Sequence, residues 1–499
     1  MPIPREILDV DRPVNTVVAA YGKNKDRYAV KQRIGCKRVN GRNVPVTGPT
    51  IGHIIDGSYI PLTSTAAVSS SPFDLLDWGI VEYTYRFMEP LIPELMKQYN
   101  REDAEKILCI ALLRVCYPGI KDYELKSAYE ESFLSVICPH VALSKNTVSS
   151  FLGDLGKTYS RIIAFMRERA ASVERGHHLI IDGTLKSDES TVNSLSNFSR
   201  KARTKGSKDI SVIYAYDLET GEPICSECFP GNMLDITAYH RFIQDNGILQ
   251  GIIVADKGFP ESAAAEAFAK NPDLHYLNPV KRNSKYIERH NLHEYDRAVV
   301  GHEGLLCKKA KVEGRRKWLY SFRDSAKAAK EEMDWLKRTE VFSDEALKKK
   351  QRSFGTIVLE CDLDLSPEEV YKAYACRWEI ELVMRYYKSA LDLDETRVHD
   401  DYSVIGTEFI DFLSSAVTMR VLNDLDNAGI LKEMTYKKVM SILRRAKKVR
   451  CSSGEDWQLV KLNPSQEEVL RKLQLLPAKE EPPKRKRGRP PKIPQNKAI

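Results

Sequence analysis

A chain of 499 residues, 42% of them hydrophobic, is long enough for two to four domains with a large buried core. It has no run of eighteen apolar residues, its first residues lack a signal-peptide pattern, and its ten cysteines are scattered. We therefore expect a soluble intracellular protein with reduced thiols, and neither a membrane-embedded nor a disulfide-stabilised secreted one. The net charge is +8; eight Lys or Arg against two Glu from residue 477 onward supply +6 of it, which leaves +2 for the rest.

The first third of the chain divides into a β-rich part and a helical part. Residues 1–62 alternate strand-like runs with turn residues, and 64–72 have the composition of a linker. Residues 73–172 are helical in pattern. Within them, the segment 143–152 begins with a good N-cap and could enter a DNA groove, but we favour an ordinary packed helix.

Two aspartates follow apolar, β-rich runs. Asp182 ends the run that starts at His178, Asp256 ends the run 251–255, and a glycine stands close behind each. Short continuous apolar runs predict central strands, and an acid at the carboxyl end of such a strand points into the crevice where open α/β sheets bind ligands. Turn chemistry, for which Asp before Gly is common, is the alternative.

Residues 210–229 predict a hairpin, and residues 235–244 predict a crossover helix. The cysteine pair at 225 and 228 is expected to have a structural role and not to bind a metal.

A basic hairpin is predicted farther along, from strands at 305–312 and 317–322. Its turn carries Arg315 and Arg316, and Trp318 follows. Cations next to an aromatic ring suit phosphate contact and base stacking, while an edge strand protected by lysines is equally compatible with the pattern. The charged helical stretch 324–351 is interpreted as scaffold.

A polar stripe is predicted on a helix over residues 374–388. At 100° per residue, Tyr374, Arg377, Glu381 and Lys388 fall within about 60° of one another, beside an apolar arc. The alternative is a solvent-exposed helix face on which Arg377 and Glu381 form a weak ion pair worth about 0.2–0.5 kcal/mol. Combined with Asp182 and Asp256, however, Glu381 completes a set of carboxylates able to hold two Mg²⁺ ions for phosphodiester chemistry.

The tail ends in a short basic motif. Arg487 and Arg489 flank a glycine and precede a proline, which resembles the core of an AT-hook, a peptide that lays arginines into the minor groove of A·T-rich DNA. We expect this tail to be disordered when free. A nonspecific polybasic segment is the alternative.

The four residues of the polar stripe resemble the Y-R-E-K signature of DDE-class insertion-sequence transposases, in the superfamily named after insertion sequence four. Asp182 and Asp256 look like the first and second catalytic aspartates of that family, so the resemblance covers about residues 176–422. It implies an α/β multidomain protein with a ribonuclease H-like core and a mostly β insertion. It also implies Mg²⁺, for which Mn²⁺ can substitute, bound by Asp182, Asp256 and Glu381.

Further expectations follow from this resemblance. Tyr374, Arg377 and Lys388 would hold phosphates, and Trp318 would hold a displaced base. The partners would be double-stranded DNA, at terminal inverted repeats and at the target, and a second copy in a synaptic homodimer. The location would be the prokaryotic cytoplasm, at the nucleoid. The predicted domains are a β-rich module at 1–62, a helical region that could bind DNA at 73–172, a catalytic domain at 176–435 with an insertion at about 270–360, a helical region at 436–476 and a basic tail at 477–499.

The predicted function is cut-and-paste DNA transposition, with metal-dependent cleavage at element ends followed by strand transfer. Two alternatives stay open: a domesticated relative that binds DNA without catalysis, and a nuclease of the same fold that cuts without joining. The complete set of three carboxylates argues against the first.

Overall fold

The computed structural model divides the protein into two compact units, Met1–Asp74 with Arg450–Asp456, and Leu75–Val449 with Trp457–Ile499. The residues that the structure describes are 3–21, 27–39, 42–55, 57–61, 73–188, 190, 192–199, 206–254, 268–339, 341–378, 381, 385, 388, 391, 395–396, 398, 400–451 and 456–478.

The smaller unit is a four-stranded antiparallel sheet in the order β1-β2-β3-β4. Val18, Val30 and Ile54 form its small core. The predicted β-rich character of residues 1–62 is confirmed. The elements are α1 (Arg5–Leu8), β1 (Thr16–Tyr21), β2 (Arg27–Val39), β3 (Arg42–Ile55) and β4 (Ser58–Pro61).

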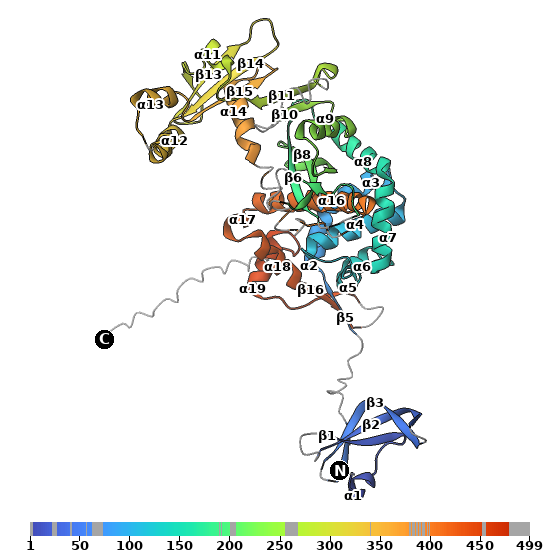
Figure 1. Ribbon diagram of the computed structural model, residues 1–499. Coiled ribbons are helices and arrows are strands. Elements are labelled where there is room, and N and C mark those ends of the chain that lie inside the picture. The colour runs from blue at the N-terminus through green and yellow to red at the C-terminus, as the bar shows by residue number, and fades with distance from the viewer. Residues whose placement is uncertain are drawn as a thin grey trace, which may run out of the picture. The chain divides into compact units, whose positions relative to one another are not determined.

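The larger unit is built on a mixed sheet in the order β12-β13-β14-β15-β11-β10-β6-β8-β7, with β9 paired to β8. Strands β6, β10 and β11 run parallel, and the other pairs are antiparallel. Strands β13 to β15, from the predicted insertion, continue this sheet beyond β11 (Figure 1). The strands are β6 (His178–Ser187), β7 (Asn197–Phe198), β8 (Lys208–Asp217), β9 (Glu222–Pro230), β10 (Gly251–Val254), β11 (Leu274–Pro279), β12 (Arg297–Ala298), β13 (Leu305–Lys311), β14 (Trp318–Asp324) and β15 (Thr356–Cys361).

Helices from both halves of the chain pack on the β6–β8–β9 part of this sheet. The helices before the sheet are α2 (Gly79–Met88), η1 (Glu89–Leu91), α3 (Ile92–Met96), α4 (Arg101–Cys116), α5 (Leu125–Glu131), α6 (Leu134–Ile137), α7 (Lys145–Lys157) and α8 (Tyr159–Ala171). Those within or after it are α9 (Asp235–Asp245), α11 (Lys285–Arg289), α12 (Ser325–Arg338), α13 (Asp344–Gln351), α14 (Pro367–Ala375), η2 (Cys376–Trp378), α16 (Asp401–Asn427), α17 (Ile430–Glu433), α18 (Tyr436–Arg445) and α19 (Pro464–Lys472). A second sheet has the order β17-β16-β5, from β5 (Asp74–Asp77), β16 (Lys447–Arg450) and β17 (Gln458–Leu459).

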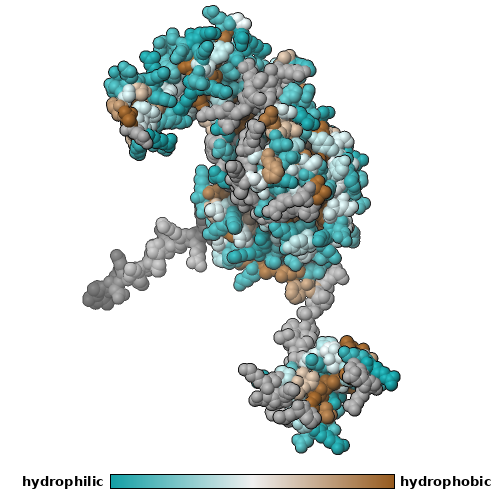
Figure 2. Space-filling view, in the orientation of Figure 1, coloured by the Kyte–Doolittle hydropathy of each residue, from teal (hydrophilic) through white to brown (hydrophobic). Residues whose placement is uncertain are grey.

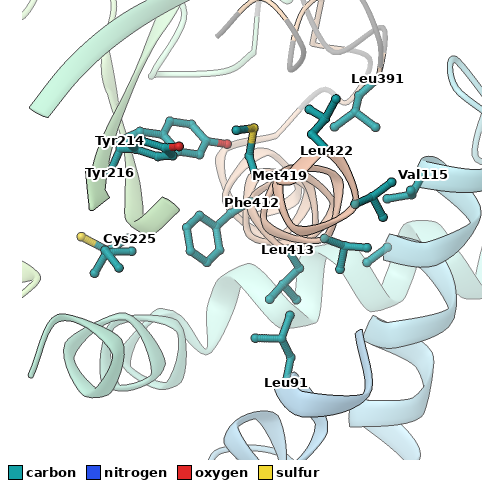
Figure 3. Packing of buried hydrophobic residues seen from close by; sticks show 14 of the residues in the cluster. Leu91, Val115, Tyr214, Tyr216, Cys225, Leu391, Phe412, Leu413, Met419 and Leu422 are labelled. Atoms are coloured by element: carbon teal, nitrogen blue, oxygen red, sulfur yellow. The ribbon is translucent and has the colours of Figure 1, made fainter. Parts of the chain in front are cut away.

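Helix α16 lies at the centre of the core because apolar residues surround its axis on every side. Figure 3 looks along this helix: Phe412 and Met419 reach toward Tyr214 of β8, while Leu413 points toward Leu91. Burial of each large apolar side chain stabilises the fold by about 1.5–3 kcal/mol. Packing around α16 therefore joins the N-terminal helices to the sheet. None of the helices in the described part of the chain is long and apolar enough to cross a bilayer.

Helix α7 confirms the predicted N-cap and the packed interpretation. Ser144 accepts a hydrogen bond from the Thr147 amide at 3.3 Å, which begins the helix. Its inner face is buried at Val148 and Leu152 and lies against α16. The backbones approach so closely that a Cβ at Gly156 would stand 1.8 Å from the Tyr402 carbonyl oxygen. This face of α7 is therefore occupied by protein.

Candidate active site

Asp182 lies within strand β6, so the prediction that the strand ends there is wrong. β6 continues to Ser187 because β8 pairs with it along its whole length, from Leu179↔Asp217 to Ser187↔Asp209. The parallel partner β10, in contrast, has its last described pair at Ile180↔Val254. Asp182 therefore stands just past the described parallel pairing. Its side chain is half-buried, and its Oδ1 accepts a hydrogen bond from the Gly183 amide at 2.9 Å.

A cavity of about 440 Å³ opens beside Asp182. Its walls come from β6, β8, α9 and the loop between β9 and α9, including Ser211, Asn232 and Tyr239. The loop can approach so closely because Gly231 has no side chain: a Cβ there would lie 2.0 Å from the Asp209 carbonyl oxygen. Sequence reasoning left residues 231–235 without a role. The glycine was the one signal that the loop is held against the sheet.

The polar stripe is not carried by one regular α-helix, which corrects the prediction for residues 374–388. Helix α14 begins with a capping box between Ser366 and Glu369 and ends at Ala375, and a 3₁₀ turn occupies Cys376–Trp378. The Cys376 amide already bonds to carbonyls two and four residues back, which tightens the last turn. The 100° spacing therefore does not extend unchanged across this turn.

Three of the four signature residues, Tyr374, Arg377 and Lys388, make the following contacts. The Arg377 guanidinium lies 5.6 Å from the centre of the Tyr374 ring, a cation–π contact. Glu381 is helical and exposed. Lys388 is half-buried, and its Nζ donates to the Leu185 carbonyl oxygen at 3.0 Å. Lys388 thus ties the signature segment to the strand that carries Asp182.

A second contact holds the following residues to the same strand. Glu395 forms a parallel bridge with Ser187, and the Thr396 amide donates to the Ser187 carbonyl oxygen at 2.8 Å. Asp209 of β8 is paired with Ser187 of β6. Desolvation raises the pKa of Asp209, and the positive charge of Lys388 opposes this rise. Lys388, Glu395 and Thr396 therefore all contact the carboxyl-terminal end of β6.

A buried charge network also anchors β6. Lys186 shares the strand face of Asp182 and is only 2% exposed. Its ammonium pairs with Glu408 and, at 3.2 Å, with Asp411 of α16, and Asp411 also pairs with Arg114 of α4. Desolvation lowers the pKa of Lys186, but attraction to the two carboxylates outweighs it, so the net shift is upward. Lys186 is therefore held charged beside its carboxylate partners.

The remaining predicted residues fall outside this cluster. Asp256, Arg487 and Arg489 lie outside the described residues. Arg315 and Arg316 are exposed in the turn between β13 and β14, which confirms the predicted hairpin. Trp318 is half-buried, with the Lys311 ammonium 5.5 Å from its ring centre. The surface over β13, β14, α12 and α13 is largely hydrophilic (Figure 2).

Metal-ligand geometry appears at a different place in the described part of the chain. The ligand atoms of His177, Asp217 and Glu219 all lie within 4.8 Å of one another. His177 is five residues before Asp182, on the order of 16 Å along the strand, so this group is separate from the predicted triad. Its members already bind protein groups: His177 Nδ1 meets Asp217 at 2.8 Å, and Glu219 accepts from the His178 amide at 2.7 Å. This group includes a histidine nitrogen, whereas Asp182 and Glu381 offer only carboxylate oxygens, the hard donors that suit Mg²⁺.

A cavity of about 1110 Å³ is lined by residues of the segments around α11, α12 and α13 and by none of the predicted catalytic residues. Arg282, Lys285, Arg338 and Arg352 line it together with three lysines of α13 and Trp335. Desolvation and the charges of Arg352 and Arg323 lower the pKa of His293 in its wall. The segment interpreted as scaffold thus forms a basic hollow, which its dense Lys and Arg content could have indicated.

Comparison with known proteins gives a match to a family model in sequence and a weak likeness to a solved structure. No curated protein matches the chain. A solved structure described as "Cryo-EM structure of piggyBac transposase synaptic complex with hairpin DNA (SNHP)" has a TM-score of 0.38 and 11% identity, and covers 69% of this chain and 70% of that one. A likeness at this level does not establish a shared fold. In sequence, residues 175–404, just under half of the chain, match the family model described as "Transposase DDE domain".

Proposed function

We propose that this protein is a DNA transposase that cuts DNA at the ends of a mobile element and joins the freed ends to target DNA. The observation that carries the proposal is the position of Asp182, half-buried beside a cavity on a central strand, inside the segment that matches a transposase DDE domain. Glu381 and Lys388 belong to the same matched segment, and Lys388 is bonded to the same strand.

The strand order supports a ribonuclease H-like core. Strands β9, β8 and β6 form an antiparallel meander, and β10 and β11 follow as parallel strands on the other side of β6. Such a core, with β12–β15 as the insertion, fits the resemblance in the sequence. The insertion adds strands to the edge of the same sheet instead of forming a sheet of its own.

The register between β6 and β10 supports a close approach of Asp182 and Asp256. Ile180 pairs with Val254, and Asp182 and Asp256 each stand two residues farther along. Two residues of continued parallel pairing would place both carboxylates on the same face of neighbouring strands, about 4.8 Å apart. Glu381 would complete the set from the signature segment. This register is part of the proposal.

The chemistry needs divalent ions and a grip on DNA. Two Mg²⁺ ions, or Mn²⁺ in their place, would supply activation of the attacking oxygen and stabilisation of the leaving one. Asp182, Asp256 and Glu381 would hold them. Tyr374 and Arg377 would contact neighbouring phosphates, first while water cuts the element end and then while the freed 3′-hydroxyl attacks a target phosphodiester. Lys388 would position the signature segment through Leu185 as well as contact phosphate.

Partners and location are part of the same proposal. Terminal inverted repeats and target DNA would both be bound as duplexes, and a homodimer would cut two ends together in the prokaryotic cytoplasm. Arg315 and Arg316 are placed in an exposed turn where phosphates can reach them. Trp318 would need to leave its half-buried position to stack on a displaced base.

The test is a cleavage and joining assay on DNA that carries the element ends, with Mg²⁺. Asp182→Asn and Glu381→Gln are expected to lose cleavage at least 100-fold while binding the ends as the wild type does. Glu395→Gln is the matched control, because it removes an exposed acid fourteen residues later. Retained metal-dependent cleavage in Glu381→Gln would refute the assignment. Cut product without joined product identifies a nuclease, and bound DNA alone identifies a non-catalytic relative.

A further inference from the structure

Strands β2 and β3 extend beyond the core of the smaller unit as a two-stranded arm, which we define as residues 31–39 and 42–50. Its pairing runs from Lys31↔Thr50 to Val39↔Arg42. The core ends at Val30 and Ile54. Every residue of β2 from Gln32 to Arg38 is exposed, and because successive side chains alternate between faces, neither face of this strand is covered. Figure 1 shows the two strands as long paired arrows.

The arm carries a charge of one sign. Residues 31–50 contain five basic side chains and no Asp or Glu: Lys31, Arg33, Lys37, Arg38 and Arg42. Two apolar side chains of the arm are exposed, Ile34 by 63% and Val44 by 39%. A two-stranded ribbon without a buried face is marginally stable in water, and five cations repel one another along it. An anionic partner bound to the arm would cover its exposed faces and reduce the repulsion between its cations.

We propose that the arm binds duplex DNA by lying in the major groove. The groove is about 12 Å wide and admits a two-stranded ribbon, whose strands lie about 4.8 Å apart. Nine residues per strand extend about 30 Å, close to one helical turn of DNA. Register shifts at Val30/Lys31, Lys31/Arg33 and Arg33/Gly35 bend and twist the ribbon, which suits a curved groove. The basic side chains would contact the phosphates on both sides.

Duplex DNA is the favoured polyanion for a reason of shape. The major groove of A-form RNA is deep and too narrow for a ribbon, so double-stranded RNA would leave the arm outside. The inference rests on the proposed function only for its choice of DNA. The arm's charge, exposure and pairing stand without the catalytic assignment, and the arm belongs to a different unit from Asp182.

The first experiment measures the affinity of the full chain for a 30-base-pair duplex at several salt concentrations. The triple variant Arg33→Ala/Lys37→Ala/Arg38→Ala is expected to bind at least tenfold more weakly, and the slope of log K against log salt is expected to fall by about 2–3, since each lost phosphate contact removes about 0.9. Arg38→Ala and Arg5→Ala form a matched pair. Arg5 is exposed, lies in the same unit and is not on the arm, so its loss should leave affinity unchanged.

The second experiment identifies the groove. Guanine N7 lies in the major groove, so the full chain should protect it from methylation, and the triple variant should lose that protection. Unchanged affinity and slope in the triple variant would overturn the proposal, as would protection confined to the minor groove or tighter binding to duplex RNA. Cleavage separates this test from the other: Asp182→Asn should keep N7 protection and lose cutting, whereas a chain that never cuts but loses protection with the arm would refute only the catalytic assignment.

Discussion

Glu227 on β9 is a buried carboxyl whose pKa rises to about 7, mainly because burial removes it from water. The Tyr159 hydroxyl at 2.6 Å and the Asn246 amide at 2.7 Å donate to it and oppose the rise. The folded protein therefore binds a proton here that the unfolded chain releases near pH 4.5. As pH rises from about 4.5 to about 7, the free energy of unfolding falls by about 3 kcal/mol at most, and it stays lower above pH 7.

Glu227→Gln should remove this pH dependence, because glutamine copies the neutral acid. We expect the variant to have a higher urea midpoint than the wild type at pH 8 and a similar one at pH 5. Glu313→Gln, at an exposed position, is the control and should follow the wild type at both values. A Glu227→Gln variant that is less stable than the wild type at pH 8 would show that the carboxylate form is the preferred one.

Lys186 should be costly to truncate, because its removal leaves Glu408 and part of the charge of Asp411 uncompensated in the core. We expect Lys186→Met to lower the free energy of unfolding by about 3–5 kcal/mol. The double variant Lys186→Met/Glu408→Leu should recover part of that loss, because Arg114 still pairs with Asp411. Urea unfolding of the wild type, Lys186→Met, Glu408→Leu and the double variant gives the coupling energy. Strictly additive losses would show that the two residues do not act as a pair.

At the scale of elements, the α7–α16 contact depends on glycines at particular positions. A Cβ at Gly156 would stand 1.8 Å from the Tyr402 carbonyl oxygen, whereas one at Gly153, on the same helix, would stand 3.4 Å from the Ser403 hydroxyl. Gly156→Ala is expected to destabilise by about 1–3 kcal/mol or more through overpacking. Gly153→Ala should be neutral or stabilising by about 0.5–1 kcal/mol, from helix propensity. Thermal unfolding should therefore shift in opposite directions, and a matching decrease in both would contradict the packing argument.

Local sequence predicted the elements whose signals are local. The β8–β9 hairpin, helix α9, the Ser144 cap and the hairpin that carries Arg315 are all present. Each depends on a turn, a cap or a period within a few residues. The predicted end of the strand at Asp182 was wrong because strand pairing far along the chain determines it. Strand β6 continues through Asp182 and Gly183 because β8 pairs with it there, and this long-range pairing overrides the local turn signal.

The candidate site shows the same division. Asp182 could be found from its run of apolar residues, but its cavity could not, because the loop after β9 reaches it through tertiary packing. The break in the signature helix at Cys376–Trp378 was equally hidden, since the residues there have helical periodicity. Lys388 was expected to contact phosphate only, and its bond to the Leu185 carbonyl depends on a strand about two hundred residues earlier.

At the scale of the whole molecule, positive charge is concentrated at places far apart in the chain. The tail from residue 477 carries +6 of the net +8, and the arm of β2 and β3 carries five cations. The tail and the arm together carry +11, so the rest of the chain has a net charge of −3, although the hollow around α13 is locally basic. DNA affinity should therefore divide into separable contributions rather than a uniform field.

Truncation after residue 478 tests the contribution of the tail. Loss of its eight Lys and Arg should weaken duplex binding and lower the slope of log K against log salt, by at most about 7 at 0.9 for each cation. Preference for A·T-rich over G·C-rich duplexes should disappear as well, if arginines enter a narrow minor groove. The matched pair is Arg487→Ala/Arg489→Ala against Lys484→Ala/Lys486→Ala, since both remove two charges but only the first disrupts the Arg-Gly-Arg-Pro core. Equal losses on both DNAs in the two variants would make the tail a nonspecific polybasic segment, because the effect would then follow charge alone.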